Sequence, residues 1–122
     1  MARIVIRLDF ADGRRVGPGK VGLLEAIGRT GSISAAGRAL GMSYRRAWLL
    51  VEELNQMFTE PVVVTQLGGQ GGGGARLTPL ALSLIEQYRA VEQAAQEQAQ
   101  ARLAGLEAAL SPLAAGAAPE EA

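Results

Sequence analysis

The sequence contains neither cysteine nor histidine. The lack of cysteine excludes disulfide bonds and thiolate metal sites, and the lack of histidine removes the commonest general base and the commonest metal ligand. No pairing of a nucleophile with an activating base can be recognised either. The sequence therefore predicts a protein that is not an enzyme, with no metal site and no cofactor bound to this chain.

Long apolar runs are also missing. The N-terminal stretch carries Arg3, Arg7, Asp9 and Asp12, so it lacks the uninterrupted apolar core of a signal peptide. No stretch reaches the roughly 18 apolar residues of a transmembrane helix. We expect a soluble cytoplasmic protein that makes no contact with a membrane.

Aromatic residues are scarce at 4%, whereas hydrophobic residues make up 48% of the 122 residues. The chain is the size of one small domain, and its core is expected to be mostly aliphatic side chains and alanine. Ten basic and six acidic residues give residues 1–80 a net charge of +4, and two basic and six acidic residues give residues 81–122 a net charge of −4. A basic N-terminal part fits an anionic partner, although an ordinary distribution of surface charge explains this asymmetry equally well.

The chain begins with a pattern typical of a strand. Residues 3–10 alternate apolar and polar side chains, which is the period of a half-buried strand with Ile4, Ile6, Leu8 and Phe10 on the inner face. Asp12-Gly13 reads as a tight turn, and residues 14–16 can return as a short second strand. An N-terminal hairpin is therefore expected.

Three helices are expected next. Pro18 suits a first helical turn, and Gly31 ends that helix. Ser32 is a good N-cap for a short helix over 33–40, and Ser43 is a good N-cap for a third helix from Tyr44 to about Phe58. The apolar stripe of the first helix comprises Val21, Leu23, Leu24 and Ile27, and that of the third comprises Ala47, Leu50 or Val51, and Leu54.

The second and third of these helices match a helix-turn-helix. Two helices that cross closely need small residues, which Ala36 and Gly37 supply, and the turn needs a residue that tolerates positive φ, which Gly41 supplies. Leu40 and Met42 flank the turn and are expected to point inward. The start of the third helix would then enter the major groove of DNA.

Six glycines occupy seven positions between Gly68 and Gly74, interrupted only by Gln70. The β-branched run 62–65 precedes them and residues 75–78 follow as a return strand, so the glycines read as the tip of a β-hairpin. An interdomain linker is a weaker alternative, and a phosphate cradle would need a Lys-Ser/Thr pair leading into a helix, which is absent. A hairpin directly after a recognition helix is the wing of a winged helix, whose bare backbone can approach DNA phosphates closely.

The predicted DNA contacts combine the recognition helix with this wing. Arginine can pair with guanine, and serine, tyrosine and arginine can hold phosphates. A solvated helix face is the alternative for Arg45 and Arg46. The predicted set is Ser32, Ser43, Tyr44, Arg45, Arg46, Gly69, Gln70, Gly71, Gly72, Gly73, Gly74 and Arg76.

A long helix is expected from Pro79 to about Leu110, roughly 45 Å in length. Its apolar residues follow a heptad-like stripe with one stutter, which favours pairing with the same helix of a second chain, whereas a shorter helix with a frayed end is the alternative. The predicted dimerisation residues are Leu84, Tyr88, Val91, Ala95, Ala99, Leu103 and Leu106. The remaining residues, 111–122, read as a disordered tail.

Two segments resemble the N-terminal DNA-binding domain of the ModE family of molybdate-responsive transcriptional regulators, whose winged helix is similar to that of LysR-type regulators. They are GSISAAGRALGMSYRRAW, which is followed by EELNQM, and GGQGGGGARLT. The resemblance covers roughly residues 18–95. It implies a homodimer that binds an inverted-repeat operator in double-stranded DNA. Nothing after Leu110 resembles the molybdate-binding Mop domains, so the chain looks like a single-domain member in which molybdate is at most an effector without a recognisable site.

These patterns predict an α+β, mainly α fold. The expected parts are a winged helix-turn-helix over 1–78, a dimerisation helix over 79–110 and the tail over 111–122. The expected function is a dimeric, sequence-specific transcriptional regulator of molybdenum-related genes. Two rivals stay open: a protein-interaction adaptor acting through the Ala/Gln-rich helix, which the zero net charge mildly favours, and a small oxyanion-binding protein that uses the glycine loop.

Overall fold

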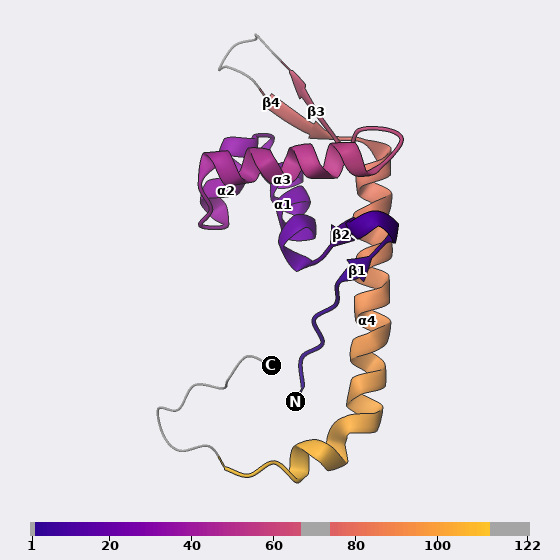
Figure 1. Ribbon diagram of the computed structural model, residues 1–122. Helices are drawn as coiled ribbons and strands as arrows, with labels where there is room; N and C mark the ends of the chain where they lie inside the picture. The colour runs from indigo at the N-terminus through magenta and orange to yellow at the C-terminus, as the bar shows by residue number, and fades with distance from the viewer. Residues whose placement is uncertain (1, 67–73, 113–122) are drawn as a thin grey trace.

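The computed structural model describes residues 2–66 and 74–112. Helices α1–α3 cluster beneath the β3–β4 hairpin, and α4 runs away from this cluster as a long rod (Figure 1). This mainly helical fold with small antiparallel sheets is the predicted one. The elements are β1 (Leu8–Asp9), a 3-10 turn (Ala11–Gly13), β2 (Arg15–Val16), α1 (Pro18–Thr30), α2 (Ile33–Ala39), α3 (Tyr44–Met57), β3 (Val63–Gln66), β4 (Gly74–Leu77) and α4 (Pro79–Ala108).

The N-terminal hairpin is present but short. Leu8 pairs with Val16 and Asp9 with Arg15, and the turn between the strands places Asp12 at φ 63°. Residues 2–7 continue the extended backbone beside α4 instead of forming the longer strand that the alternation predicted. Phe10 was expected inside but is exposed, because the chain turns away from the core immediately after it.

Helix α1 forms the centre of the core. Its first turn contains Pro18, and Gly31 at φ 71° ends it with its N–H donating to the carbonyl of Ile27. The predicted stripe is confirmed, because each of its four side chains is fully buried. Tyr88 of α4 is the largest buried side chain of the described residues, so α4 also contributes to this core.

Helix α3 resolves the alternative between Leu50 and Val51. Val51 is buried with Ala47, Leu54 and Met57, whereas Leu50 is only half-buried. The expectation for Leu40 was wrong, because α2 ends at Ala39 and the side chain of Leu40 is 42% exposed. Leu40 is the C-cap residue of α2: its backbone N–H donates to carbonyls of that helix, and its side chain lies at the surface where the helix ends.

The remaining boundaries differ slightly from the expected ones. β3 begins one residue later than predicted and β4 one residue earlier. α4 ends at Ala108, so Ala109 and Leu110 lie outside the helix. Thr78 caps α4 by accepting a hydrogen bond from the N–H of Ala81. The tip of the glycine hairpin, 67–73, and most of the expected tail, 113–122, lie outside the described residues.

Candidate nucleic-acid interface

The two helices of the helix-turn-helix are fixed by their caps and by one close approach. Ser32 Oγ accepts a hydrogen bond from the N–H of Ala35, and Ser43 Oγ accepts one from the N–H of Arg46, both at 3.1 Å. A side chain on Gly37 would place its Cβ 3.1 Å from that of Ala47. Gly41 has φ 70°. The sequence predicted each of these features, and together they set the direction in which α3 leaves the turn.

The first turn of α3 presents uncompensated positive charge. Tyr44, Arg45 and Arg46 are all exposed, Tyr44 to 60%. Among the described residues, neither arginine forms an ion pair, although the salt bridges elsewhere on the surface engage Arg7, Arg14, Arg15, Lys20 and Arg89. A cation without an internal partner is available to an anion from outside the chain.

The wing stands beside this turn because four hydrogen bonds tie its base to the helices. Asn55 of α3 accepts hydrogen bonds from the N–H groups of Val62 and Val63 at 2.8 and 3.0 Å, and its amide donates to the carbonyl of Val63 at 3.1 Å. The N–H of Ala75 donates to the carbonyl of Gly31 at 2.8 Å. The role of Asn55 was not predicted from the sequence, in which it is an amide that directly follows Leu54 of the apolar stripe.

Only the base of the wing is described. The ladder runs from Val63 opposite Leu77 to Gln66 opposite Gly74, and Arg76 is exposed on it without an ion pair among the described residues. The predicted contacts at Gly69, Gln70 and Gly71–Gly73 lie outside the described residues.

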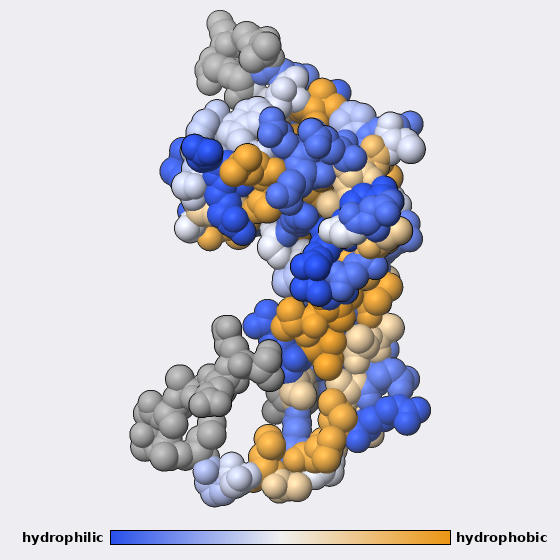
Figure 2. Space-filling view, in the orientation of Figure 1, coloured by the Kyte–Doolittle hydropathy of each residue, from blue (hydrophilic) through white to orange (hydrophobic). Residues whose placement is uncertain are grey.

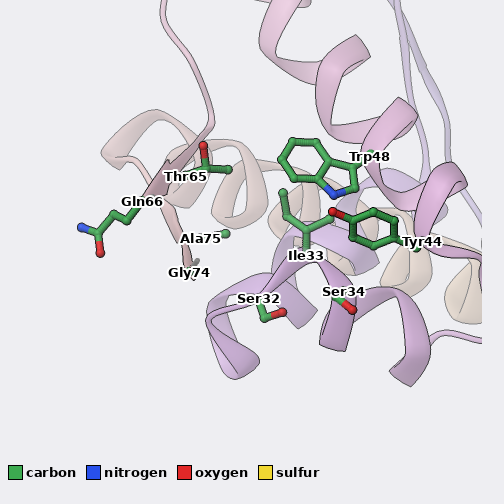
Figure 3. Close-up of a pocket in the computed structure, with 9 residues that line it drawn as sticks. All are labelled: Ser32, Ile33, Ser34, Tyr44, Trp48, Thr65, Gln66, Gly74 and Ala75. Atoms are coloured by element: carbon green, nitrogen blue, oxygen red, sulfur yellow. The ribbon is translucent and has the colours of Figure 1, made fainter. Parts of the chain in front are cut away.

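A cavity of about 250 Å³ separates the wing from the helix-turn-helix, and Figure 3 shows the side chains around it. The start of α2, the exposed side of α3 and the wing base each contribute to it. Tyr44 and Trp48 meet edge to face, with ring centroids 6.1 Å apart. Trp48 Nε1 is buried there without a hydrogen-bond partner among the described residues. The lining residues are Ser32, Ile33, Ser34, Tyr44, Trp48, Thr65, Gln66, Gly74 and Ala75.

The structure thus brings three predicted contact residues, Ser32, Tyr44 and Gly74, to one cavity. Arg45 lies next to it, on the adjoining surface that Trp48 and Leu49 share. Ser43, Arg46 and Arg76 do not line the cavity. Ser34, Thr65 and Trp48 line it but were not predicted as contacts. The position of Ser34 in the first turn of α2 is the sequence signal that indicates it.

The predicted dimerisation stripe of α4 is partly used within the chain. Tyr88 and Ala99 are buried in the single chain, and the core and the N-terminal residues cover Tyr88, so we expect Tyr88 to be unavailable to a second chain; the dimer contact along the stripe stays a prediction. Val91 and Leu106 are exposed, and Leu84, Ala95 and Leu103 are half-buried. Figure 2 shows hydrophobic side chains gathered along this part of the molecule, below the winged helix.

In residues 2–66 and 74–112, no group of three or more acidic side chains could hold a metal ion. No helix in the same ranges combines the length and the apolar character needed to cross a bilayer.

This geometry is that of a winged helix-turn-helix. The chain has a structural neighbour in the CbnR DBD–DNA complex, with a TM-score of 0.53 over 71% of this chain and 95% of that one. The sequence identity to it is 18%, so this likeness confirms the fold and nothing further. No protein-family model matches the sequence.

The sequence is ModE-like. It is 39% identical over 85 residues to the molybdenum transport protein ModE of Azotobacter vinelandii and 35% identical over 96 residues to the DNA-binding transcriptional dual regulator ModE of Escherichia coli K12, which cover 70% and 79% of this chain. It is also 52% identical over 80 residues, or 66% of this chain, to the molybdenum-pterin-binding protein MopB of Rhodobacter capsulatus. The matches span 30% to 37% of these relatives, so the chain spans about a third of their length. These relatives confirm the resemblance that the helix-turn-helix and wing motifs predicted.

Proposed function

We propose that this chain is a dimeric, sequence-specific DNA-binding regulator of molybdenum-related genes. One observation carries the proposal: the exposed start of α3 and the wing base present Arg45, Arg46 and Arg76 without ion-pair partners among the described residues. The names of the similar proteins, which include transcriptional regulators and molybdenum proteins, support the same function.

The recognition step assigns different tasks to the two cationic elements. Arg45 and Arg46 lie on adjacent helix positions about 100° apart, so one can pair with a base edge in the major groove while the other meets the backbone. The hydroxyls of Ser32, Ser34 and Thr65 around the cavity can donate to phosphate oxygens. Arg76 adds positive charge where the wing approaches the phosphate backbone of DNA.

The proposed dimer uses the surface of α4 that the chain leaves exposed. Val91 and Leu106 are large apolar side chains on the outside of this helix. Two-fold pairing along α4 would present two recognition helices to an inverted repeat. Tyr88 takes no part in this contact.

The test is selection of bound fragments from a random duplex pool, followed by affinity measurement against salt concentration. We expect a palindromic sequence with half-sites about one helical turn apart, or a multiple of it. Binding that shows no sequence preference and disappears near 150 mM salt would reject a sequence-specific regulator and favour the protein-interaction adaptor.

The effector is tested in the same assay. We propose that molybdate, if it acts on this chain, changes the affinity for the selected fragment. Calorimetric titration of the chain with molybdate alone distinguishes a direct effector from one that acts through another protein. Measurable heat with an unchanged DNA affinity would instead support the small oxyanion-binding protein.

A further inference from the structure

The N-terminal segment, defined here as residues 2–7, is an extended chain with two different edges. Its side chains alternate, with Ala2, Ile4 and Ile6 half-buried and Arg3, Val5 and Arg7 exposed; Val5 is 57% exposed. In an extended strand the backbone groups also alternate, so even and odd residues point their N–H and C=O groups to opposite edges.

One edge is satisfied by side chains of α4. Gln96 accepts a hydrogen bond from the N–H of Ile4 at 2.8 Å and donates to the carbonyl of Ala2 at 2.7 Å. The N–H of Ala2 donates to a carboxylate oxygen of Glu107, and the hydroxyl of Tyr88 donates to the carbonyl of Ile6. These three side chains serve the even residues as a neighbouring strand would.

The other edge has no partner in the described chain. The backbone N–H and C=O groups of Arg3, Val5 and Arg7 make no hydrogen bond with any residue in 2–66 or 74–112. The β1–β2 ladder does not use this edge either, because the N–H of Phe10 donates to Arg14 on the side of the even residues. An open edge of this kind is a template for a further strand.

Charge selects the partner strand and its register. The open edge is formed by the backbone groups of odd-numbered residues, so a second strand that pairs with it through its own open edge must place odd-numbered residues opposite odd-numbered residues. If Ile6 lies on a two-fold axis, Arg3 faces Asp9 of a second copy and Val5 faces its Arg7. If the two-fold axis lay at Val5, Arg3 would face Arg7 of the second copy. If it lay at Arg7, the two Arg7 side chains would face each other. Like charges directly opposite each other are destabilising. Arg3 makes no ion pair within the described residues, whereas Asp9 is paired with Arg7 and Arg15 of its own chain; in this register Arg3 of the second copy joins them at Asp9.

The geometry points to an antiparallel pairing of this segment with the same segment of a second copy, with Ile6 at the two-fold axis. The inference rests on the proposed dimer and adds the strand edge to its contact: residues 2–6 are hydrogen-bonded to Gln96 and Tyr88 of α4, the helix that also carries the exposed Val91 and Leu106. The occupant is a second copy because the segment is self-complementary in charge only in this register.

Disulfide cross-linking tests the pairing without DNA, and the absence of cysteine from the chain makes it specific. Val5→Cys and Arg7→Cys are made separately on chains of different size and mixed under mild oxidation. Opposite residues of a hydrogen-bonded pair have Cα atoms about 5.5 Å apart, which a disulfide spans. We expect the mixed dimer to form at least tenfold faster than either homodimer and than a dimer of Leu49→Cys, which is exposed on α3.

A homodimer of the Val5→Cys variant that forms faster than the mixed dimer would overturn the register, and cross-linking rates equal to those of Leu49→Cys would overturn the pairing. Val5→Pro gives an independent test, because it removes an N–H that has no partner in residues 2–66 or 74–112. We expect it to weaken self-association at least tenfold in sedimentation equilibrium while leaving thermal unfolding of the monomer unchanged; unchanged association would also reject the pairing. Neither experiment contains DNA. A negative result for the strand pairing therefore leaves the test of sequence-specific DNA binding intact, and a negative result in the DNA selection leaves the cross-linking test intact.

Discussion

The hydroxyl of Tyr88 donates a 2.8 Å hydrogen bond to the carbonyl of Ile6, 82 positions earlier in the sequence. Tyr88 is 1% exposed, and burial raises the pKa of its hydroxyl, which therefore stays protonated as a donor at neutral pH. The contact joins the N-terminal segment to the long helix. It also explains why a residue in the middle of an apparent dimerisation stripe belongs to the core of its own chain.

Tyr88→Phe removes this hydrogen bond and keeps the ring. We expect the free energy of unfolding to fall by about 1 kcal/mol, since the carbonyl of Ile6 loses its partner. Urea unfolding at neutral pH measures the change. Tyr44→Phe is the matched control, because the exposed Tyr44 should change stability by less than about 0.5 kcal/mol. Equal effects of the two variants would contradict the structural role of Tyr88.

Arg45→Ala and Arg46→Ala are expected to weaken binding to the selected DNA sequence, at least one of them by about 1–3 kcal/mol. The variant that loses a base contact should also tolerate substitution of one base pair in the site, which competition with mutated duplexes would detect. Arg102→Ala, an exposed arginine of α4, is the control and should bind normally. Unchanged affinity of both α3 variants would remove this helix from the interface.

Arg76→Ala tests the wing. A contact with the phosphate backbone carries no sequence information, so the loss should be similar on all duplexes and the slope of log affinity against log salt should decrease by about one unit. Binding titrations at several salt concentrations, on the selected and on a scrambled duplex, measure both quantities. A loss confined to the selected duplex would mean instead that the wing reads bases.

Gly37→Ala and Gly22→Ala should have effects of opposite sign. The Cβ added at position 37 would lie 3.1 Å from that of Ala47 and close to Met42, so we expect a destabilisation of about 1–3 kcal/mol. Gly22 has open space around it inside α1, where alanine should stabilise by about 0.5–1 kcal/mol. Chemical denaturation measures both, and Ala47→Gly should rescue the position 37 variant. Two effects of the same sign would refute the close approach of α2 and α3.

The Arg89–Glu25 pair predicts a pH dependence. Arg89 of α4 holds Glu25 of α1 at 2.6 Å and Glu92 at 2.7 Å, and the hydrogen bond from Arg89 lowers the pKa of Glu25 below its ordinary 4.5. A lowered carboxyl pKa stabilises the fold above the unfolded pKa, and this contribution is lost as the pH falls through the folded pKa.

Arg89→Gln should therefore cost about 1 kcal/mol at pH 7, and the difference from the natural chain should shrink below pH 4.5. Urea unfolding at pH 7 and at several pH values below 4.5 measures it, with Arg102→Gln as the control. A difference that stays constant with pH would assign the effect to packing of the Arg89 side chain and not to its charge.

Much of the fold could be predicted because its signals are local. Pro18, Gly31, Ser32, Gly41 and Ser43 mark helix ends through backbone geometry that depends only on neighbouring residues. The exposure of Leu40 could not be predicted, since whether a residue at a helix end is buried depends on where the helix stops and on which elements pack beside it. The hydrogen bonds of Asn55 could not be predicted, because its partners, Val62 and Val63, become its neighbours only when the chain turns back after α3.

The sequence by itself determined the helix-turn-helix, the position of the wing and the charged residues at the start of the recognition helix, because periodicity, caps and small residues encode them within a few positions. Only the tertiary structure decided what covers the stripe of α4. A heptad pattern indicates that one side of a helix is apolar, but it does not indicate whether the same chain or a second chain covers that side. Here residues 2–6 lie beside it, held by Tyr88, Gln96 and Glu107. One edge of the N-terminal segment is therefore satisfied, and the other has no partner in the part of the chain that the structure describes.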